Sequence, residues 1–397
     1  MKIGLFTDQY YPSISGVVTS IKMLYEGLEA MGHECYIFTS YDEKLDENNS
    51  ESHNKRVINF KARPYPFRNL KDYRYTFTHN RFVKEVKEYN LDVIHVHTEY
   101  NISKIAIKAS KKYGIPIVHT LHTLFDDYLQ YVSPFFSKHF HKQMLHGLKL
   151  MFTGPISKYA TIQIVPTEKV LTTASNYGVG SYADVKIIPT GIELSRFYKT
   201  NYSDDEINEL KSKLNIKDEF IFLYVGRVSE EKNIKNIVDA YSKINKDNTK
   251  LLIIGGGPYL NELKELTYKL KLDNFVIFTG LIPWIDVPKY YQLGDVFVNA
   301  SLSETQGLTN IEALASEVPL LIQKDDSVKD LVIDNYNGIY FDGVEELQLK
   351  MNLIRNDLNL LNSLKNNTFE SVKLYTKEEY AKNVLNVYIE AINKFKK

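Results

Sequence analysis

Residues 301–315, SLSETQGLTNIEALA, carry the pattern that decides the fold of the second half of this chain. An apolar run over residues 295–300 predicts a strand before them, and apolar residues at helical spacing follow from Gly307 onward. Glu304 is therefore expected in a strand-to-helix loop, and Glu312 about a turn and a half into the helix. The backbone N–H groups of Gly307, Leu308 and Thr309 would be the unpaired donors of its first turn, a common anion site. Two carboxylates beside that site suit a ligand with both phosphate and hydroxyl groups, such as a nucleotide sugar.

The bulk properties predict a globular chain of two domains. Its 397 residues exceed what one core usually spans, and 44% are hydrophobic and 25% charged. The single cysteine, Cys35, excludes an internal disulfide and fits a reducing cytosol. A charge interrupts the N-terminal strand too early for a signal peptide, and no apolar run reaches the roughly 18 residues of a membrane span.

Charge is unevenly distributed along a chain whose formal net charge is zero. Residues 51–150 hold 17 basic and 8 acidic side chains, together with nine of the ten histidines. This asymmetry predicts an anionic partner for the N-terminal half, and nucleic acid and an acidic membrane surface are both candidates at this point.

The N-terminal half begins with a strand, a helix and a second strand in Rossmann order. Lys2–Thr7 and Glu34–Thr39 are the expected strands, and the loop between them lacks the G-x-G-x-x-G fingerprint of a dinucleotide cofactor. A later strand, Ile115–Leu121, is followed at once by His122. Ligands of open α/β sheets bind just past the carboxyl ends of strands, so His122 is a candidate site residue. The alternative is an ordinary histidine at a strand end.

A second Rossmann-like half follows polar residues 199–206, which are expected to connect the two domains. Its first strand, Phe220–Val225, leads into a loop containing Arg227 and Lys232. These two cations at the end of a strand are candidate site residues. The alternative is a solvated pair of loop residues.

In their order along the chain, these motifs resemble the retaining GT-B glycosyltransferases of family 4. The E-x7-E motif of that family corresponds to Glu304 and Glu312, and its G-R-x4-K motif to Gly226, Arg227 and Lys232. The ordered combination argues against a generic strand–helix unit with two solvated glutamates. The resemblance implies an α/β fold with two Rossmann-like parallel-sheet domains facing a cleft. Residues 1–198 would form the acceptor- and membrane-binding domain, residues 199–376 the nucleotide-sugar domain, and the helix of residues 377–397 would cross back to the first domain.

The resemblance also implies roles for individual residues. The catalytic set would be His122 beside the reacting sugar, Arg227 and Lys232 on the diphosphate, and Glu304 on a hydroxyl of the donor sugar. Glu312 would hold the ribose, the backbone of Ile282 the base, and Gly16 would allow close approach to the diphosphate. Gly307, Leu308 and Thr309 complete the donor set.

Three positions depart from the usual family pattern. Ser15 stands where the first glycine of a Gly-Gly pair is usual. The loop Gly255-Gly256-Gly257 lacks the usual aspartate, which favours a structural turn. Glu317 replaces a glycine, and a left-handed backbone at Glu317 would cost about 1 kcal/mol.

Residues 133–152 predict a helix with an apolar stripe opposite a basic one. Phe136 and Phe140 belong to the apolar side, whereas Lys138, Lys142 and Lys149 lie on the other. Helices in an anionic lipid interface have this pattern. The alternative is that the stripe packs on the domain core and the lysines are merely solvated.

Several segments resemble the diacylglycerol glucosyltransferases of wall-less and related Gram-positive bacteria. They include residues 7–12, 14–20, 122–128 and 303–309, and Asp8, Asp126 and Asp127 would be the acceptor-binding residues. The implied reaction moves α-glucose from UDP-glucose to the 3-hydroxyl of 1,2-diacylglycerol at the cytoplasmic face of the cell membrane. The expected partners are a UDP-sugar, diacylglycerol and anionic membrane lipids, with no nucleic acid.

The resemblance implies no metal site and no tightly bound cofactor, and leaves Mg²⁺ at most a non-coordinated activator. Other acceptors (a soluble sugar, a thiol or a phosphatidylinositol-type lipid) and other donors such as UDP-galactose remain open. An alternative of another class is a sugar-nucleotide epimerase or a non-catalytic nucleotide-binding protein on the same fold.

Overall fold

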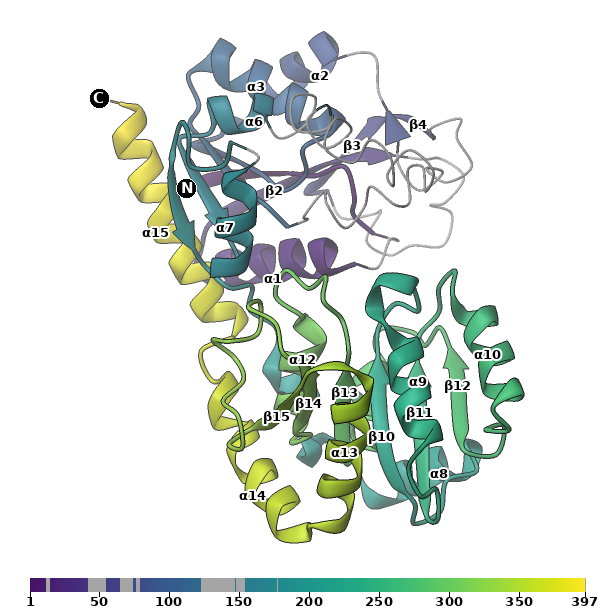
Figure 1. Cartoon of the computed structure of the whole chain (residues 1–397). Helices are drawn as coiled ribbons and strands as arrows, with labels where there is room; N and C mark the ends of the chain where they lie inside the picture. The colour runs from purple at the N-terminus through teal and green to yellow at the C-terminus, as the bar shows by residue number, and fades with distance from the viewer. Residues whose placement is uncertain are drawn as a thin grey trace. The chain divides into compact units, whose positions relative to one another are not determined.

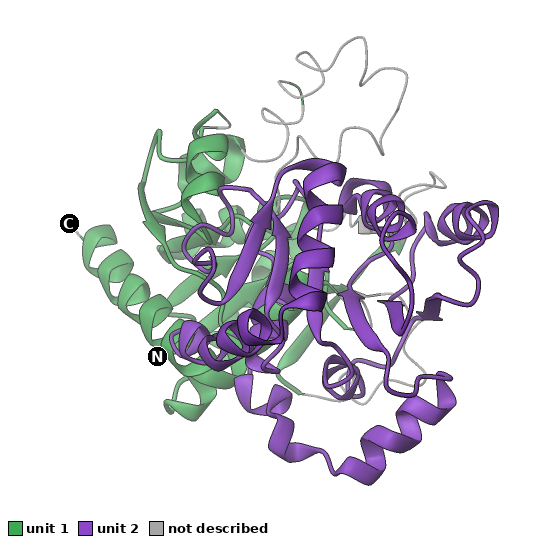
Figure 2. Ribbon diagram, turned by 60° about the horizontal axis from the view of Figure 1, so that its bottom comes forward, with its two compact units in different colours: residues 1–191, 377–397 green, residues 192–376 purple. Residues whose placement is uncertain are grey.

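The computed structural model describes residues 1–11, 15–41, 55–64, 74–75, 79–122, 147, 154–176 and 178–396. The chain forms two compact units, which Figure 2 shows in different colours. Unit 1 contains Met1–Gly191 and Lys377–Lys397, and unit 2 contains Ile192–Thr376. No helix in the described part of the chain combines the length and the apolar character needed to cross a bilayer.

Unit 1 is built on a sheet of seven parallel strands (Figure 1). Their order across the sheet is β3 (Val57–Lys61), β2 (Glu34–Tyr41), β1 (Lys2–Phe6), β6 (Val93–Val96), β7 (Ile117–Thr120), β8 (Ile162–Val165) and β9 (Asp184–Ile187). The central strands β6, β7 and β8 are buried at every residue. Helices cover both faces of a parallel sheet, which is why these strands are nearly continuous apolar runs. A short antiparallel pair, β4 (Arg63–Pro64) and β5 (Arg74–Tyr75), forms a separate two-stranded sheet.

Two hydrophobic clusters lie on the two faces of this sheet. One contains residues of α1 (Gly16–Ala30) and α15 (Lys377–Phe395), and the other contains residues of α2 (His79–Val86) and α3 (Asn101–Tyr113). The short helices α6 (Gly154–Tyr159) and α7 (Glu168–Ser175) precede and follow β8.

The last helix, α15, belongs to unit 1 although the whole of unit 2 separates it from the rest of that unit in sequence. Tyr388 on α15 contacts His95 on β6, with 2.7 Å between its hydroxyl oxygen and Nδ1 of the histidine. Gly27 lets α1 and α15 pack closely, because a Cβ at Gly27 would lie 2.5 Å from that of Ala381. The prediction that the last helix crosses back to the first domain is confirmed.

Unit 2 is built on a second sheet, of six parallel strands. Their order is β12 (Val276–Gly280), β11 (Thr249–Ile254), β10 (Phe220–Val225), β13 (Val296–Asn299), β14 (Leu320–Gln323) and β15 (Gly338–Phe341). The accompanying helices are α8 (Asp204–Lys213), α9 (Ile234–Ser242), α10 (Leu260–Lys269), α11 (Val287–Tyr291), α12 (Leu308–Ala315), α13 (Gly343–Asn356) and α14 (Leu358–Thr368). The strand order reverses at β10, whose neighbours are β11 and β13. Ligands of open α/β sheets bind at such a switch point, outside the carboxyl ends of the strands.

The first boundary between the units lies seven residues before the sequence-based one, between Gly191 and Ile192 rather than after Tyr198. Residues 192–198 belong to unit 2 because Leu194 and Phe197 are buried in its core. The ring of Phe197 packs edge-on against that of Tyr291, with 5.7 Å between centroids. The expected polar connection over residues 199–206 is also partly wrong. Helix α8 begins at Asp204, where Ser203 and Glu206 form a capping box.

Candidate active site

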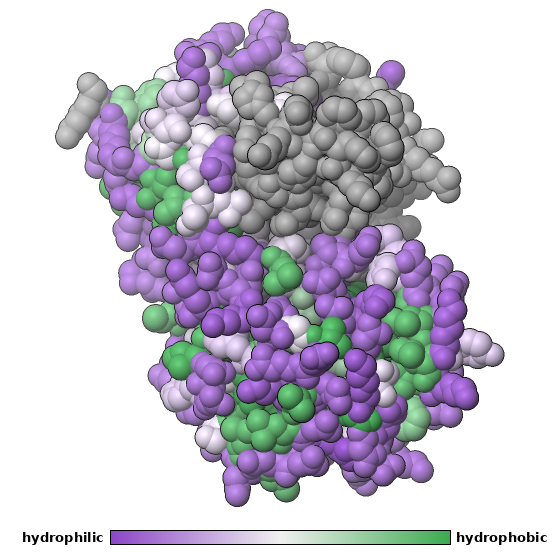
Figure 3. Space-filling view, viewed as in Figure 1, coloured by the Kyte–Doolittle hydropathy of each residue, from purple (hydrophilic) through white to green (hydrophobic). Residues whose placement is uncertain are grey.

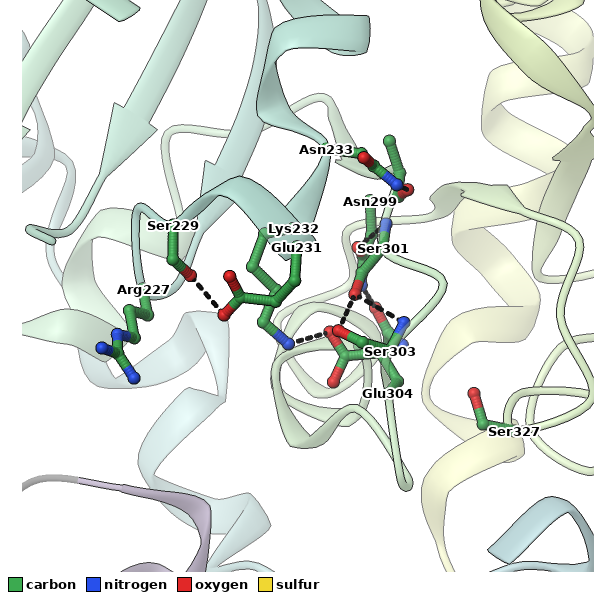
Figure 4. A network of polar contacts seen from close by, with 12 residues as sticks. Arg227, Ser229, Glu231, Lys232, Asn233, Asn299, Ser301, Ser303, Glu304 and Ser327 are labelled. Atoms are coloured by element: carbon green, nitrogen blue, oxygen red, sulfur yellow. Dashed lines mark hydrogen bonds and ion pairs between the residues drawn. The ribbon is translucent and has the colours of Figure 1, made fainter. Parts of the chain in front are cut away.

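The switch point of unit 2 brings together two of the predicted catalytic residues (Figure 4). Lys232 ends a 3₁₀ helix, Glu230–Lys232, in the loop after β10, and Glu304 lies in the loop after β13. The Lys232 ammonium nitrogen is 2.7 Å from Oε1 of Glu304, in a pair whose side chains are 21% and 16% exposed. A cation and a carboxylate are thus held at the position where the topology predicts a ligand.

Glycines shape the loop that carries Arg227 and Lys232. A Cβ at Gly255 would lie 1.9 Å from the carbonyl oxygen of Gly226, and one at Gly257 would lie 2.1 Å from that of Val228. The loop after β11 therefore packs backbone to backbone against the loop after β10, and these contacts favour a structural role for residues 255–257. The Arg227 side chain is exposed, while its carbonyl oxygen accepts a hydrogen bond from the Tyr224 hydroxyl at 3.0 Å.

Three asparagines that the sequence analysis missed fix the Glu304 loop. Asn233, directly after Lys232, donates to the carbonyl oxygen of Ala300 at 3.2 Å and so ties the two loops together. Asn299 accepts from the Ser301 N–H at 3.0 Å and donates to Oδ1 of Asn310 at 3.0 Å. These bonds fix residues 299–301, at the start of the loop that carries Glu304.

Helix α12 begins directly after this loop. Its N-cap is Gly307, which has a positive φ of 74° and no side chain with which to cap the helix. A Cβ here would lie 2.4 Å from Nδ2 of Asn310, so the position requires glycine for conformation and for space. Leu308 and Thr309 form the first turn, as predicted, and the helix dipole favours an anion at this end.

Glu312, on α12, lies beside a buried tyrosine. The Tyr291 hydroxyl donates a hydrogen bond of 2.7 Å to Oε2 of Glu312. Burial raises the pKa of Glu312 to about 7, and the Tyr291 hydrogen bond and the positive charge of Arg196 oppose the rise. Arg196 itself stacks on the indole of Trp284, 3.4 Å from the ring centroid. Trp284 lies in the loop after β12, two residues beyond the predicted base-binding residue Ile282.

A further carboxylate, Glu231, lies in the loop beside Lys232 and was also missed by the sequence analysis. Its Oε1 accepts a hydrogen bond of 2.5 Å from the Ser229 hydroxyl. Burial raises its pKa, while the neighbouring Lys232 lowers it.

In unit 1, His122 follows β7 as predicted and pairs with a second histidine. Its Nε2 lies 3.0 Å from Nδ1 of His97, which follows β6. Burial, the largest cause, lowers the pKa of His122 to about 3, so its ring is neutral at physiological pH. Gly16 begins α1, and Ser15 is the N-cap of that helix, accepting from the Val18 N–H at 3.3 Å.

Asp8, predicted to bind the acceptor, caps a helix. Its Oδ1 accepts from the N–H groups of Asn101 and Ile102 at 3.0 and 3.2 Å, and its Oδ2 accepts from the Thr98 hydroxyl at 2.7 Å. The side chain is only 6% exposed, and this burial raises its pKa to about 6. These contacts favour a structural role for Asp8 at the start of α3.

Other predicted residues of the first domain lie outside the described residues. They are Asp126 and Asp127 of the acceptor set and Phe136, Lys138, Phe140, Lys142 and Lys149 of the membrane helix. Among the residues that are described, no group of three or more acidic, histidine or cysteine side chains could hold a metal ion.

Two family models match the chain, one in each half: "Glycosyltransferase Family 4" over residues 14–196 and "Glycosyl transferases group 1" over residues 206–371. A curated relative, the alpha-monoglucosyldiacylglycerol synthase of Acholeplasma laidlawii, is 38% identical over 99% of this chain and 98% of its own. The enzyme of the same name from Streptococcus pneumoniae is 35% identical over 100% of this chain and 88% of its own. The chain belongs to the glycosyltransferase family of these synthases.

Solved structures confirm the GT-B fold of this glycosyltransferase. A crystal structure of Anabaena HepE in complex with UDP and glucose is 19% identical, with a TM-score of 0.77 over 98% of this chain and 100% of that one. Sucrose-phosphate synthase from Thermosynechococcus elongatus is 22% identical, with a TM-score of 0.78 over 99% of each chain. At these identities the likeness shows the fold alone.

The matched regions divide the predicted site residues of the glycosyltransferase between them. Gly16 and His122 lie in the first region, and Arg227, Lys232, Glu304 and Glu312 lie in the second. Of the residues that sequence reasoning missed, Asn233 had a local signal, because asparagine readily adopts the left-handed conformation (φ 50°) that starts α9. Tyr291 had none, since its contact with Glu312 joins residues 21 positions apart.

Proposed function

We propose that this glycosyltransferase moves α-glucose from UDP-glucose to the 3-hydroxyl of 1,2-diacylglycerol, with retention at the anomeric carbon. The observation that carries the proposal is the similarity, over nearly the full length, to the two alpha-monoglucosyldiacylglycerol synthases. The geometry of unit 2 supports the binding of the donor, UDP-glucose. A basic surface of unit 1 supports binding to the membrane that contains the acceptor, diacylglycerol.

The donor diphosphate binds between the loop after β10 and the start of α12. Arg227 and Lys232 supply positive charge, and the N–H groups of Gly307, Leu308 and Thr309 supply hydrogen-bond donors. As the bond to the sugar breaks, negative charge grows on the diphosphate, and these fixed groups stabilise it more strongly than they stabilise the ground state. Arginine can hold two phosphate oxygens at once, whereas lysine acts as a point charge.

Glu304 and Glu312 hold the two sugars of the donor. Glu304 accepts a hydrogen bond from a glucose hydroxyl, and its contact with Lys232 places that hydroxyl near the diphosphate. Glu312 accepts from the ribose hydroxyls, and the loop containing Ile282 contacts the base through its backbone. Tyr291 and Arg196 offset part of the cost of ionising Glu312 before the ribose arrives.

Chemistry then occurs on one face of the sugar. The acceptor hydroxyl attacks the face from which the diphosphate leaves, and the β-phosphate helps to accept its proton. The positive charge of Arg227 and Lys232 serves the leaving group, so the proposed reaction has no protein-bound metal and leaves Mg²⁺ at most a non-coordinated activator. His122 lies beside the reacting sugar.

Access to the lipid acceptor depends on a basic surface of unit 1, made of exposed residues on α2, α3 and α6. The exposed residues of α3 are all lysines: Lys104, Lys108, Lys111 and Lys112. Neighbouring positions add Arg81, Lys84, Lys87 and Lys158, against two exposed acids, Glu88 and Asp92. Figure 3 shows mainly hydrophilic residues over this part of the molecule. A basic surface near anionic lipid gains about 1 kcal/mol per lysine or arginine. We place it at the cytoplasmic face of the cell membrane, together with the predicted helix of residues 133–152.

A transfer assay tests the proposal. Purified protein is incubated with radiolabelled UDP-glucose and mixed vesicles of anionic lipid that contain or lack 1,2-diacylglycerol, and label in the lipid extract is counted. Label should enter the lipid phase only with diacylglycerol, and UDP-galactose should replace UDP-glucose poorly. Transfer to a water-soluble sugar or thiol at a higher rate than to diacylglycerol would contradict the proposal.

A further inference from the structure

Four buried or partly buried histidines lie at the carboxyl ends of β6 and β7. Two of them have hydrogen-bond partners for both ring nitrogens. His95 contacts the Tyr388 hydroxyl and the Thr120 hydroxyl, each at 2.7 Å. His119 contacts Glu99 at 3.1 Å and the side-chain amide of Gln163 at 3.3 Å.

His97 differs from these two. Its ring is 1% exposed and nearly parallel to that of His122, with an interplanar angle of 19°. Its Nδ1 lies 3.0 Å from Nε2 of His122, whereas its own Nε2 is buried and has no hydrogen-bond partner in the described part of the chain. One nitrogen of each ring thus takes part in the hydrogen bond between His97 and His122.

Burial lowers the pKa of both histidines, so each ring carries one proton. Two arrangements of these protons allow the hydrogen bond. In one, Nδ1–H of His97 donates to Nε2 of His122, and the proton of His122 lies on Nδ1. In the other, Nε2–H of His122 donates to His97, and the remaining proton of His97 lies on its unpartnered Nε2. A buried N–H without a partner is rarer than a buried acceptor without one, so the first arrangement is favoured.

We propose that His97 is a positioning residue that fixes the tautomer of His122, so that Nδ1 of His122 carries the proton. The inference rests on the proposed function, which places His122 beside the reacting sugar. In this tautomer His122 offers the substrate a neutral N–H donor, able to bind a sugar oxygen. It does not act as the base for the acceptor hydroxyl, a task that falls to the β-phosphate.

The direct test is the tautomer of His122 in the full-length protein. Long-range ¹H–¹⁵N spectra of protein labelled with ¹⁵N-histidine separate protonated from bare ring nitrogens, and His122→Gln assigns the signals of His122. Wild-type protein should show a protonated Nδ1 and a bare Nε2 at His122. A protonated Nε2 would overturn the proposal. This readout needs no activity, so a failure of the proposed function leaves it intact.

Substitutions at His97 test whether the tautomer of His122 affects turnover. His97→Asn keeps an N–H donor near the position of Nδ1, so the tautomer and turnover should stay close to those of the wild type. His97→Asp offers only acceptor oxygens, which should move the proton of His122 to Nε2. Loss of this preorganised donor should lower turnover by about two orders of magnitude. His119→Gln is the matched control, since it alters a neighbouring buried histidine with no hydrogen bond to His122.

Thermal unfolding separates positioning from folding. If His97 matters only for packing, turnover will follow stability across the Asn, Asp and control variants while the His122 signals stay unchanged. That result would overturn the proposal. Should His97→Asp fail to fold, His97→Leu replaces it: without a donor or an acceptor at position 97, both tautomers of His122 should appear.

Discussion

Replacing Lys232 by alanine removes the cation that lies nearest to Glu304, and it should lower turnover by about 10²–10³-fold, the usual cost of one preorganised group that stabilises transition-state charge. The 2.7 Å pair with Glu304 holds the ammonium at the switch point before the donor binds. Folding should survive the change. Both side chains are partly exposed, so screening limits the stability contribution of the ion pair to about 1 kcal/mol or less.

Steady-state kinetics with UDP-glucose and vesicles containing diacylglycerol would measure the effect, with the unfolding midpoint as the check on folding. Lys235→Ala is the matched control. Lys235 lies three residues further along and makes an ion pair of 2.6 Å with Asp239, but it is on the exposed surface of α9. The turnover of the Lys235→Ala variant should equal that of the wild type. If Lys232→Ala keeps near wild-type turnover, Lys232 does not stabilise the leaving group and the reasoning is wrong.

Three more predictions follow from the same site and surface. Glu304→Gln should reduce turnover more than it raises KM for UDP-glucose, because the proposed contact of Glu304 is with the reacting sugar; equal or opposite changes would mean that its role belongs to Glu312. Burial raises the pKa of Glu312 to about 7, and the proposed hydrogen bonds from the ribose require its ionised form, so KM for UDP-glucose should rise as pH falls through about 7. Glu312→Gln should remove that dependence, and a pH profile of KM unchanged by it would contradict the role. Changing the four exposed lysines of α3 to glutamine should greatly weaken sedimentation with anionic vesicles, as should high salt, whereas unaltered binding would place the contact on residues 133–152 instead.

Much of the fold could be predicted because the apolar runs of the sheets are nearly continuous. Parallel strands buried on both faces leave little ambiguity about where a strand begins and ends. Phe220–Val225 was predicted to the residue, and the other expected strands were predicted to within two residues at either end. Glu317, which stands in place of the usual glycine, has a φ of 61°, the left-handed backbone whose cost was considered for this position.

The rest depends on contacts between residues far apart in the sequence. Asp8 caps α3 across more than 90 positions, a contact that no local pattern reveals. Phe197 was assigned to the wrong domain because only its packing against Tyr291 shows which core it joins. The start of α8, by contrast, could have been predicted from the sequence. Ser203 and Glu206 form the S-x-x-E pattern of a capping box, which is a local signal.

The linkage in the reaction product decides whether this protein is an α-glucosyltransferase acting on diacylglycerol. Lipid formed from UDP-glucose and 1,2-diacylglycerol would be purified, and its anomeric proton coupling and carbon shifts measured by NMR. We expect a single glucose in α-linkage to the 3-hydroxyl of the diacylglycerol. A β-linked product, or glucose recovered only as free sugar, would contradict it.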